Sequence, residues 1–200
     1  MIRIILAEDQ SLLRGALASL LALETDFEIL ADLPDGQAAW AAIRRDAPDI
    51  LVTDIEMPGM SGIALAEAIQ REKLKTRILI VTTYARPGYL RRAMYAGVSG
   101  YLLKDAPATD LADAIRRVAA GERVIAPELA EAAWSAPDPL SDTERRLLRL
   151  AESGLDSRAI AKASGLARGT VRNYLHEAIS KLDASNRIEA ARIAREKGWL

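Results

Sequence analysis

Five charged or polar residues stand at the ends of the short apolar runs in the first half of the chain. Glu8 and Asp9 follow the first run and Asp54 follows the third, while Thr82 and Lys104 end the fourth and fifth. If these runs are parallel strands, their carboxyl ends share one crevice and the five side chains converge there. Crowded carboxylates repel one another unless a cation joins them, and Mg²⁺ takes carboxylate, carbonyl and water oxygens. The spacing therefore predicts an acidic pocket suited to magnesium.

Within this pocket, we expect Asp9 and Asp54 to bind the cation directly. Glu8 would support it through water, and the backbone carbonyl of Glu56 lies in the loop where a further oxygen is required. The chain has one histidine and no cysteine, which excludes disulfides and thiolate metal sites and argues against a histidine-based one. The predicted metal ligands are thus all oxygen atoms.

The same residues predict phosphoryl transfer to Asp54. A carboxylate beside a divalent cation is a competent nucleophile toward phosphorus, and the cation, the Lys104 ammonium and the Thr82 hydroxyl could neutralise the three phosphoryl oxygens. The added charge would draw Thr82 inward and leave space into which Tyr101 could swing from solvent. Thr82 or Tyr101 alone would carry little weight, because polar residues at strand ends are ordinary. Together the residues predict a switch rather than substrate turnover.

The elements that must position these residues follow from an alternation over residues 1 to about 120. Short apolar runs alternate with segments of helical composition, which is typical of βαβ units with a parallel sheet covered on both faces. The predicted strands are IRIIL (2–6), FEILA (27–31), DILVT (49–53), ILIVT (78–82) and GYLLK (100–104). The predicted helices span 12–23, 36–45, 62–72, 87–96 and 109–120. We therefore predict an α/β domain with a five-stranded, doubly wound, flavodoxin-like sheet.

Length and composition are consistent with such a domain followed by a smaller one. The chain has 200 residues, of which half are hydrophobic, and its net charge is −1. No apolar run approaches the roughly eighteen residues that a membrane span needs. The start, MIRIILAEDQ, turns acidic before the apolar region of a signal peptide could be completed. We expect a soluble protein in the cytoplasm.

The second part of the chain has no strand pattern. From 122 to 139 the sequence ERVIAPELAEAAWSAPDP loses periodicity, and its prolines indicate a linker. Ser141 and Glu144 then form a capping-box signature, and later stops and starts divide the tail into about four helices. The two central helices are joined by a three-residue turn at 164–166, which is helix-turn-helix spacing. We predict a first domain at 1–120, a linker at 121–139 and an all-α domain at 140–200.

The helix predicted from about 168 to 182 is the candidate DNA reader. Its inward stripe, at a period of 3.6 residues, consists of Val171, Leu175, Ile179 and Leu182. Arginine can pair with guanine and asparagine with adenine in the major groove, while hydroxyls and lysines suit phosphates. Residues 156–200 carry 9 basic and 5 acidic side chains, a net charge of +4, which is the sign that a phosphate backbone requires. The candidate DNA contacts are Arg168, Thr170, Arg172, Asn173, Tyr174, His176 and Lys181.

Four motifs in the first domain together resemble the receiver domain of bacterial response regulators. They are AEDQ (7–10), DIEMPGMSG (54–62), VTTYA (81–85) and AGVSGYLLKD (96–105). The resemblance covers the whole domain and departs at Asp105, where many receivers have a proline. It implies that the phosphoacceptor is Asp54, the acidic pair Asp9 with Glu8, the switch residues Thr82 and Tyr101, and the phosphoryl-contacting amine Lys104.

The tail resembles the LuxR-type helix-turn-helix over LSDTERRLLRLAESGLDSRAIAKASGLARGTVRNYLHEAISKLDASNRIEA (140–190). The whole chain therefore resembles response regulators of the NarL/FixJ class. It departs at Ala167, where the family usually has a serine cap, and Gly169 falls in the first turn of the reading helix. Each change costs about 1 kcal/mol in helix stability. Our hypothesis is that DNA partly orders this helix.

The resemblance also implies partners. They are a sensor histidine kinase, an inverted-repeat operator in double-stranded DNA, a second copy of the chain after phosphorylation, and RNA polymerase. The helix expected at 187–197, with Ile188, Ala191 and the following Trp199, is a candidate dimer surface on DNA, and the first or last receiver helix is another. The segments TTYARPGYLRRA, TVRNYL and EKGWL resemble regulators of membrane-lipid desaturation controlled by a membrane thermosensing kinase.

Two alternatives remain open at this point. An aspartate-nucleophile phosphohydrolase also places a carboxylate and Mg²⁺ at a strand end, but its usual Asp-x-Asp signature is absent because Glu56 stands two residues after Asp54. A DNA binder with a degenerate, unphosphorylated receiver is the other, and the intact set of pocket residues argues against it. We expect a regulator and not an enzyme.

Overall fold

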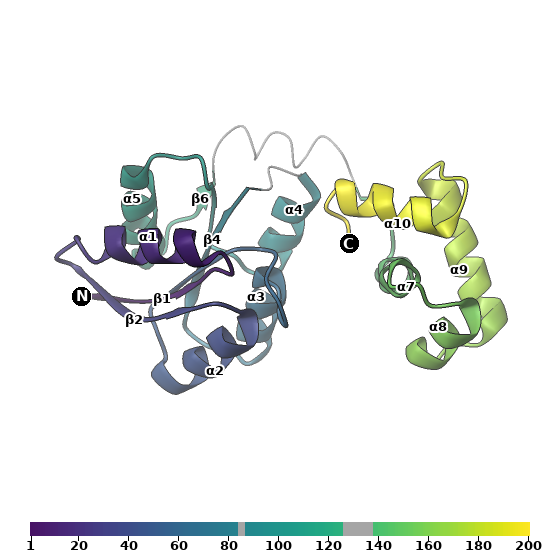
Figure 1. The fold of residues 1–200 in the computed structure, drawn as a ribbon, viewed down its shortest axis with the longest axis horizontal. Coiled ribbons are helices and arrows are strands. Elements are labelled where there is room, and N and C mark those ends of the chain that lie inside the picture. The colour runs from purple at the N-terminus through teal and green to yellow at the C-terminus, as the bar shows by residue number, and fades with distance from the viewer. Residues whose placement is uncertain (84–86, 126–137) are drawn as a thin grey trace. The chain divides into compact units, whose positions relative to one another are not determined.

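The computed structural model describes residues 1–83, 87–125 and 138–200 of the chain. They belong to two compact units, the first containing strands β1 to β6 and the second containing helices α7 to α10 (Figure 1). The first unit is a parallel sheet with helices on both faces, and the described part of the second is helical. The predicted fold class, an α/β domain followed by an all-α domain, is confirmed.

The sheet of the first unit has six parallel strands in the order β2-β1-β3-β4-β5-β6. All predicted strands are present, but the predicted number of five was one too low. The additional strand, β6, has two residues, which is too short for a periodic signal in the sequence. The strand bounds are β1 Ile2–Ala7, β2 Phe27–Leu33, β3 Ile50–Thr53, β4 Arg77–Thr82, β5 Gly100–Leu103 and β6 Val124–Ile125.

Helices cover both faces of this sheet (Figure 1). Helices α1 and α5 lie on one face, where Leu21, Leu111 and Ile115 join the inward side chains of β1, β3, β4 and β5 in one apolar core. Helices α2 and α3 contact each other on the opposite face. The helix bounds are α1 Ser11–Leu21, α2 Gly36–Asp46, α3 Gly62–Arg71, α4 Pro87–Tyr95 and α5 Ala108–Ala119, each within two residues of the prediction.

The second unit contains α7 Asp142–Glu152, α8 Ser157–Ser164, α9 Arg168–Lys181 and α10 Arg187–Glu196. Three of these helices begin at a residue whose side chain accepts from the first turn, namely Ser141, Asp156 and Asn186. Helix α9 begins at Ala167 without such a bond, as its sequence predicts. Gly165, with φ of +73°, makes the turn between α8 and α9. The predicted helix-turn-helix is thus present.

The predicted linker, 121–139, lies mostly outside the described residues, since 126–137 are not among them. Strand β6 occupies part of its beginning. Among the helices that the structure describes, none is long and apolar enough to cross a membrane.

Candidate functional site

The ends of β1 and β3 bring the predicted carboxylates together. The two strands pair in parallel up to Ala7 opposite Thr53, so the residues that follow each strand are neighbours. Ligand atoms of Glu8, Asp9 and Asp54 all lie within 4.8 Å of one another. Glu8 is 1 % exposed and Asp54 5 % exposed, whereas Asp9 faces solvent. The structure therefore forms a pocket of three carboxylates with one side open.

The Lys104 ammonium lies between two of these carboxylates. Its Nζ is 2.7 Å from Asp54 Oδ2 and 2.8 Å from Glu8 Oε2, and the side chain is 7 % exposed. The amide of Lys104 also donates to the carbonyl of Thr82, which ties the end of β5 to the end of β4. Among the residues that the structure describes here, the Lys104 ammonium is set against three carboxylates, which leaves a surplus of negative charge.

Burial and hydrogen bonding shift the pKa of two groups in this pocket. Burial raises the pKa of the Glu8 carboxyl above its ordinary value, and the bond from Lys104 offsets this only in part. Burial alone would lower the pKa of the Lys104 ammonium, but its bonds to Asp54 and Glu8 outweigh burial and raise it. Lys104 is therefore a permanent cation at the pocket.

The loop after Asp54 is fixed by close backbone packing. The amide of Ile55 donates to Asp54 Oδ1 at 2.6 Å and orients the carboxylate. A Cβ on Gly62 would lie 2.1 Å from the carbonyl oxygen of Asp54, and a Cβ on Gly36 would lie 1.8 Å from that of Met60. Glu56, the predicted carbonyl ligand, lies in this loop. Sequence reasoning missed the contact with Gly36, and only the Asp-Gly start of α2 hinted at a special position.

The two predicted switch residues are completely buried. Thr82 ends β4 and is 0 % exposed, and Tyr101 in β5 is also 0 % exposed. Tyr101 pairs with Ile80 on one side and with Ile125 of β6 on the other. The predicted swing from solvent toward the core therefore ends at the position that Tyr101 already occupies in this structure.

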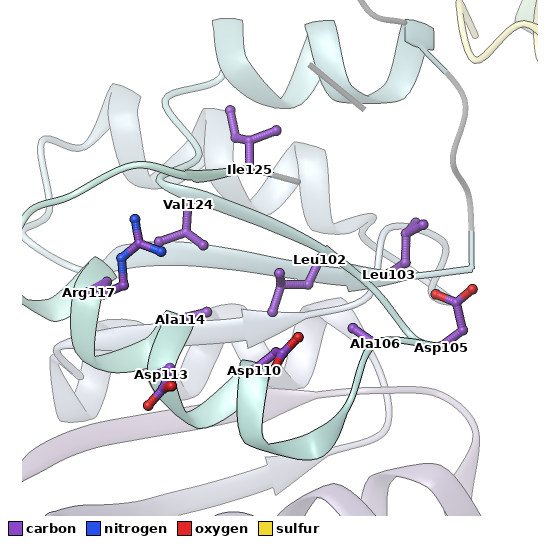
Figure 2. A pocket seen from close by; sticks show the side chains of 10 residues that line it. All are labelled: Leu102, Leu103, Asp105, Ala106, Asp110, Asp113, Ala114, Arg117, Val124 and Ile125. Carbon is purple, nitrogen blue, oxygen red and sulfur yellow. The ribbon is translucent and has the colours of Figure 1, made fainter. Parts of the chain in front are cut away.

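A separate hollow of about 500 Å³ lies between α5 and the edge of the sheet formed by β5 and β6 (Figure 2). Its lining comes from β5, β6, α5 and the loop before α5, and combines apolar residues with Asp105, Asp110 and Asp113. Arg117, also in its lining, is paired with Glu122 at 2.8 Å. Neither the predicted pocket residues nor the switch residues line this hollow.

Helix α9 places most of its predicted DNA contacts in solvent. Val171, Leu175 and Ala178 face the core of the second unit and are buried. Tyr174 is half-buried and packs against this core. The exposed candidates are Arg168, Thr170, Arg172, Asn173, His176 and Lys181.

Lys181 differs from the other candidates on α9. Its Nζ lies 2.8 Å from both carboxylate oxygens of Glu144, a residue of α7 that is 0 % exposed. Burial would raise the pKa of the Glu144 carboxyl, but the bonds from Lys181 and Ser141 outweigh it and lower this pKa. The ammonium of Lys181 therefore already has an anionic partner within the protein.

Comparison with protein families accounts for both units. Residues 4–116 match the response regulator receiver domain, and residues 138–194 match the bacterial regulatory proteins of the luxR family. The chain belongs to the response regulators. It is a transcriptional regulator in which a receiver domain is joined to a LuxR-type DNA-binding domain, which confirms the resemblance and the predicted function.

Relatives of full length support this assignment. Transcriptional regulatory protein DesR of Bacillus subtilis (strain 168) is 47 % identical over 199 residues, which cover 100 % of this chain and 99 % of the relative. The uncharacterized transcriptional regulatory protein YvfU of the same strain is 48 % identical over 200 residues, covering 100 % of both.

Solved structures show the same fold. The crystal structure of response regulator ChrA, from a heme-sensing two-component system, is 35 % identical with a TM-score of 0.58, and the match covers 100 % of this chain and 98 % of ChrA. A complex of the response regulator RcsB with DNA gives a TM-score of 0.67 at 23 % identity, covering 98 % of each chain, and supports the fold alone.

Proposed function

We propose that Asp54 is the phosphoacceptor through which a sensor histidine kinase controls DNA binding by helix α9. The observation that carries the proposal is the convergence of Glu8, Asp9 and Asp54 within 4.8 Å, with the Lys104 ammonium against Asp54. Family membership supplies the setting, because a receiver is joined to a DNA-binding domain. On this proposal the chain does not turn over a substrate.

The pocket suits Mg²⁺. Its donors are carboxylate oxygens, which hard cations prefer, and its negative charge exceeds that of one ammonium. Asp9 and Asp54 would hold the ion, with Glu8 acting through water and Glu56 supplying its carbonyl. The bound cation would neutralise charge on the phosphoryl oxygens.

The remaining pocket residues would act on the phosphoryl group. Lys104 would exchange part of its contact with Asp54 for a phosphoryl oxygen, since its Nζ is only 2.7 Å from that carboxylate. The Thr82 hydroxyl, at the end of the adjacent strand β4, would donate to another oxygen. Tyr101 would respond to the movement of Thr82, because β5, which contains Tyr101, pairs with β4, which ends at Thr82.

In the second unit we propose that α9 reads the major groove. Arg172, Asn173 and His176, exposed along the helix, would face base edges. Arg168 and Thr170 at its start, and Tyr174 further along, would contact bases or phosphates. A single small unit covers one half-site, so two copies would bind an inverted repeat after phosphorylation. The proposed domains are 1–120, 140–200 and a linker at 121–139.

The proposed setting is the cytoplasm, with a membrane-bound kinase as phosphodonor and RNA polymerase as a partner at the promoter. The proposed target genes act in membrane-lipid desaturation, as the resemblance of the segments TTYARPGYLRRA, TVRNYL and EKGWL implies.

Intact mass and size of the full chain with Mg²⁺ and acetyl phosphate test the central proposal. Wild type should gain one phosphoryl group and shift to a dimer, and Asp54→Ala should do neither. Asp105→Asn, which removes a neighbouring exposed carboxylate, is the matched control and should behave as wild type. No uptake by wild type would reject Asp54 as phosphoacceptor, and steady release of phosphate from small esters would favour a phosphohydrolase.

A further inference from the structure

The carboxylate of Glu144 joins the start of one helix to the end of another. At the start of α7, Oε2 accepts from the amide of Ser141 at 2.6 Å and from its hydroxyl at 2.8 Å, while the hydroxyl accepts from the amide of Glu144. This capping box lies 37 residues from Lys181, which is the last residue of α9. One buried carboxylate therefore fixes the first turn of α7 and the last turn of α9.

The Lys181 ammonium would have to leave this carboxylate to reach DNA. Both of its contacts to Glu144 are 2.8 Å long, and the Lys181 side chain is 38 % exposed while that of Glu144 is 0 % exposed. Withdrawal would leave a buried carboxylate without its cation, which is strongly unfavourable. The neighbours Ala178 and Leu182 are buried and hold this end of the helix against the core.

The two ends of α9 are secured differently. The first turn follows Ala167, whose side chain gives no capping bond. Apolar packing holds both ends, through Val171 in the first turn and Ala178 in the last, but only the last turn also has the Lys181 ion pair. The C-terminal end therefore carries more of the orientation of the helix than its uncapped start.

We propose that Lys181 and Glu144 are positioning residues that set the orientation of the DNA-reading helix, and that Lys181 does not contact a DNA phosphate. The inference rests on the proposed reading role of α9 and replaces a phosphate contact predicted from the sequence. On this proposal the pair sets the geometry of the DNA-binding surface, and the charge of Lys181 does not contribute to DNA binding.

The dependence of DNA affinity on salt separates these roles. The full chain is titrated with a short duplex of mixed sequence at several salt concentrations, comparing wild type, Lys181→Met and Lys162→Met. Losing a phosphate contact lowers the slope of log K against log salt by about 1. We expect Lys181→Met to keep the same slope as Lys162→Met, which removes an exposed charge from α8. A slope lower by about 1 in Lys181→Met alone would overturn the proposal.

A thermal-unfolding cycle tests the pair without DNA. Glu144→Gln, Lys181→Met and the double variant should show strongly non-additive shifts in midpoint, and Lys181→Arg should recover much of the loss. Additive shifts would reject the pair as a unit. If wild type fails to bind any duplex, DNA reading by α9 fails as a function, while the cycle still decides whether Glu144 and Lys181 act as one unit.

Discussion

Each unit places a lysine ammonium against buried carboxylate, and the two sites differ in charge balance. In the receiver, Lys104 is shared by Glu8 and Asp54, and Asp9 adds a third carboxylate. Within the described part of the chain, that site therefore keeps more negative charge than the Lys104 ammonium balances. It is therefore prepared to accept a cation and to change state when a phosphoryl group arrives.

In the helical unit, the charges balance one to one. Lys181 meets Glu144, and Ser141 occupies acceptor positions that would otherwise lack a donor. A satisfied buried network stabilises one geometry and leaves nothing for a ligand to complete. Comparison of the two sites shows that the surplus of charge, rather than burial of a lysine, distinguishes the chemical site from the structural one.

The two sites also differ in what holds them together. The helical pair is maintained by its own hydrogen bonds, whereas repelling carboxylates must be held by the surrounding backbone. The close approaches at Gly36 and Gly62 supply that support.

Disturbing the backbone around the acidic pocket should have the largest effect. Gly36→Ala places a Cβ 1.8 Å from the carbonyl oxygen of Met60, so the loop must move. We expect a loss of about 3 kcal/mol in the free energy of unfolding, by overpacking, and weaker Mg²⁺ binding in a fluorescence titration. Gly15→Ala is the control, because a Cβ on Gly15 meets nothing within 4 Å. It should stabilise the chain by roughly 0.5–1 kcal/mol. Equal effects of both variants in urea unfolding would contradict a supporting role for Gly36.

Removing one partner of the balanced pair should come next. Lys181→Met leaves Glu144 buried without its cation and should cost about 2 kcal/mol, less than for a fully buried pair because the lysine is 38 % exposed. Lys162→Met should change the unfolding midpoint little.

In the acidic pocket, Asp54→Asn should abolish phosphorylation and should lower the free energy of unfolding less than Lys181→Met does. It breaks the hydrogen bond to Lys104 but also relieves repulsion among the carboxylates. A larger loss of stability in Asp54→Asn than in Lys181→Met would contradict the proposed difference in charge balance between the two sites.

Acid should weaken the pair of Glu144 and Lys181, because protonation of Glu144 removes its negative charge. The pKa of Glu144 is lowered from its ordinary value of 4.5, so its contribution to stability is complete above pH 4.5 and is lost as pH falls through the lowered pKa. Amide exchange in α7, corrected for the intrinsic effect of pH, should accelerate below pH 4.5 in wild type. In Glu144→Gln, the amides of α7 should exchange faster than in wild type at neutral pH, and their exchange should not accelerate further below pH 4.5. An identical step in Glu144→Gln would assign it to another group.

The smallest effect is expected at the uncapped end of α9. Ala167→Ser supplies a hydroxyl that can accept from the first turn, and should stabilise the helix by about 1 kcal/mol. Exchange of amides in the first turn should slow in the free protein. The extra protection on binding DNA should then shrink, because the serine has already ordered that turn. Unchanged exchange in wild type on binding DNA would disprove ordering by DNA.

Sequence reasoning located the acidic pocket because strand ends in a parallel sheet are set by the order of apolar runs. Glu8, Asp54 and Lys104 needed only that rule to be placed together. It failed for β6, whose two residues carry no pattern.

Sequence reasoning also failed where two distant segments meet by shape or charge. Periodicity placed Lys181 away from the inward stripe of α9 but could not show that its ammonium turns to Glu144. Local spacing predicts the capping box of Ser141 and Glu144. It does not predict the ion pair that Glu144 also forms with Lys181, 37 residues further along the chain. The approach of Gly36 to Met60 likewise depends on packing of α2 against the loop after β3.

The pairing of β5 with β6 gives the receiver a short route outward. Tyr101 lies opposite Ile125, the last residue of the sheet before the chain continues toward the second unit. Any displacement of the β5 backbone would therefore reach Ile125 across a single ladder of hydrogen bonds. Tyr101 and the last described residue before the segment that joins the two units are therefore neighbours in the sheet.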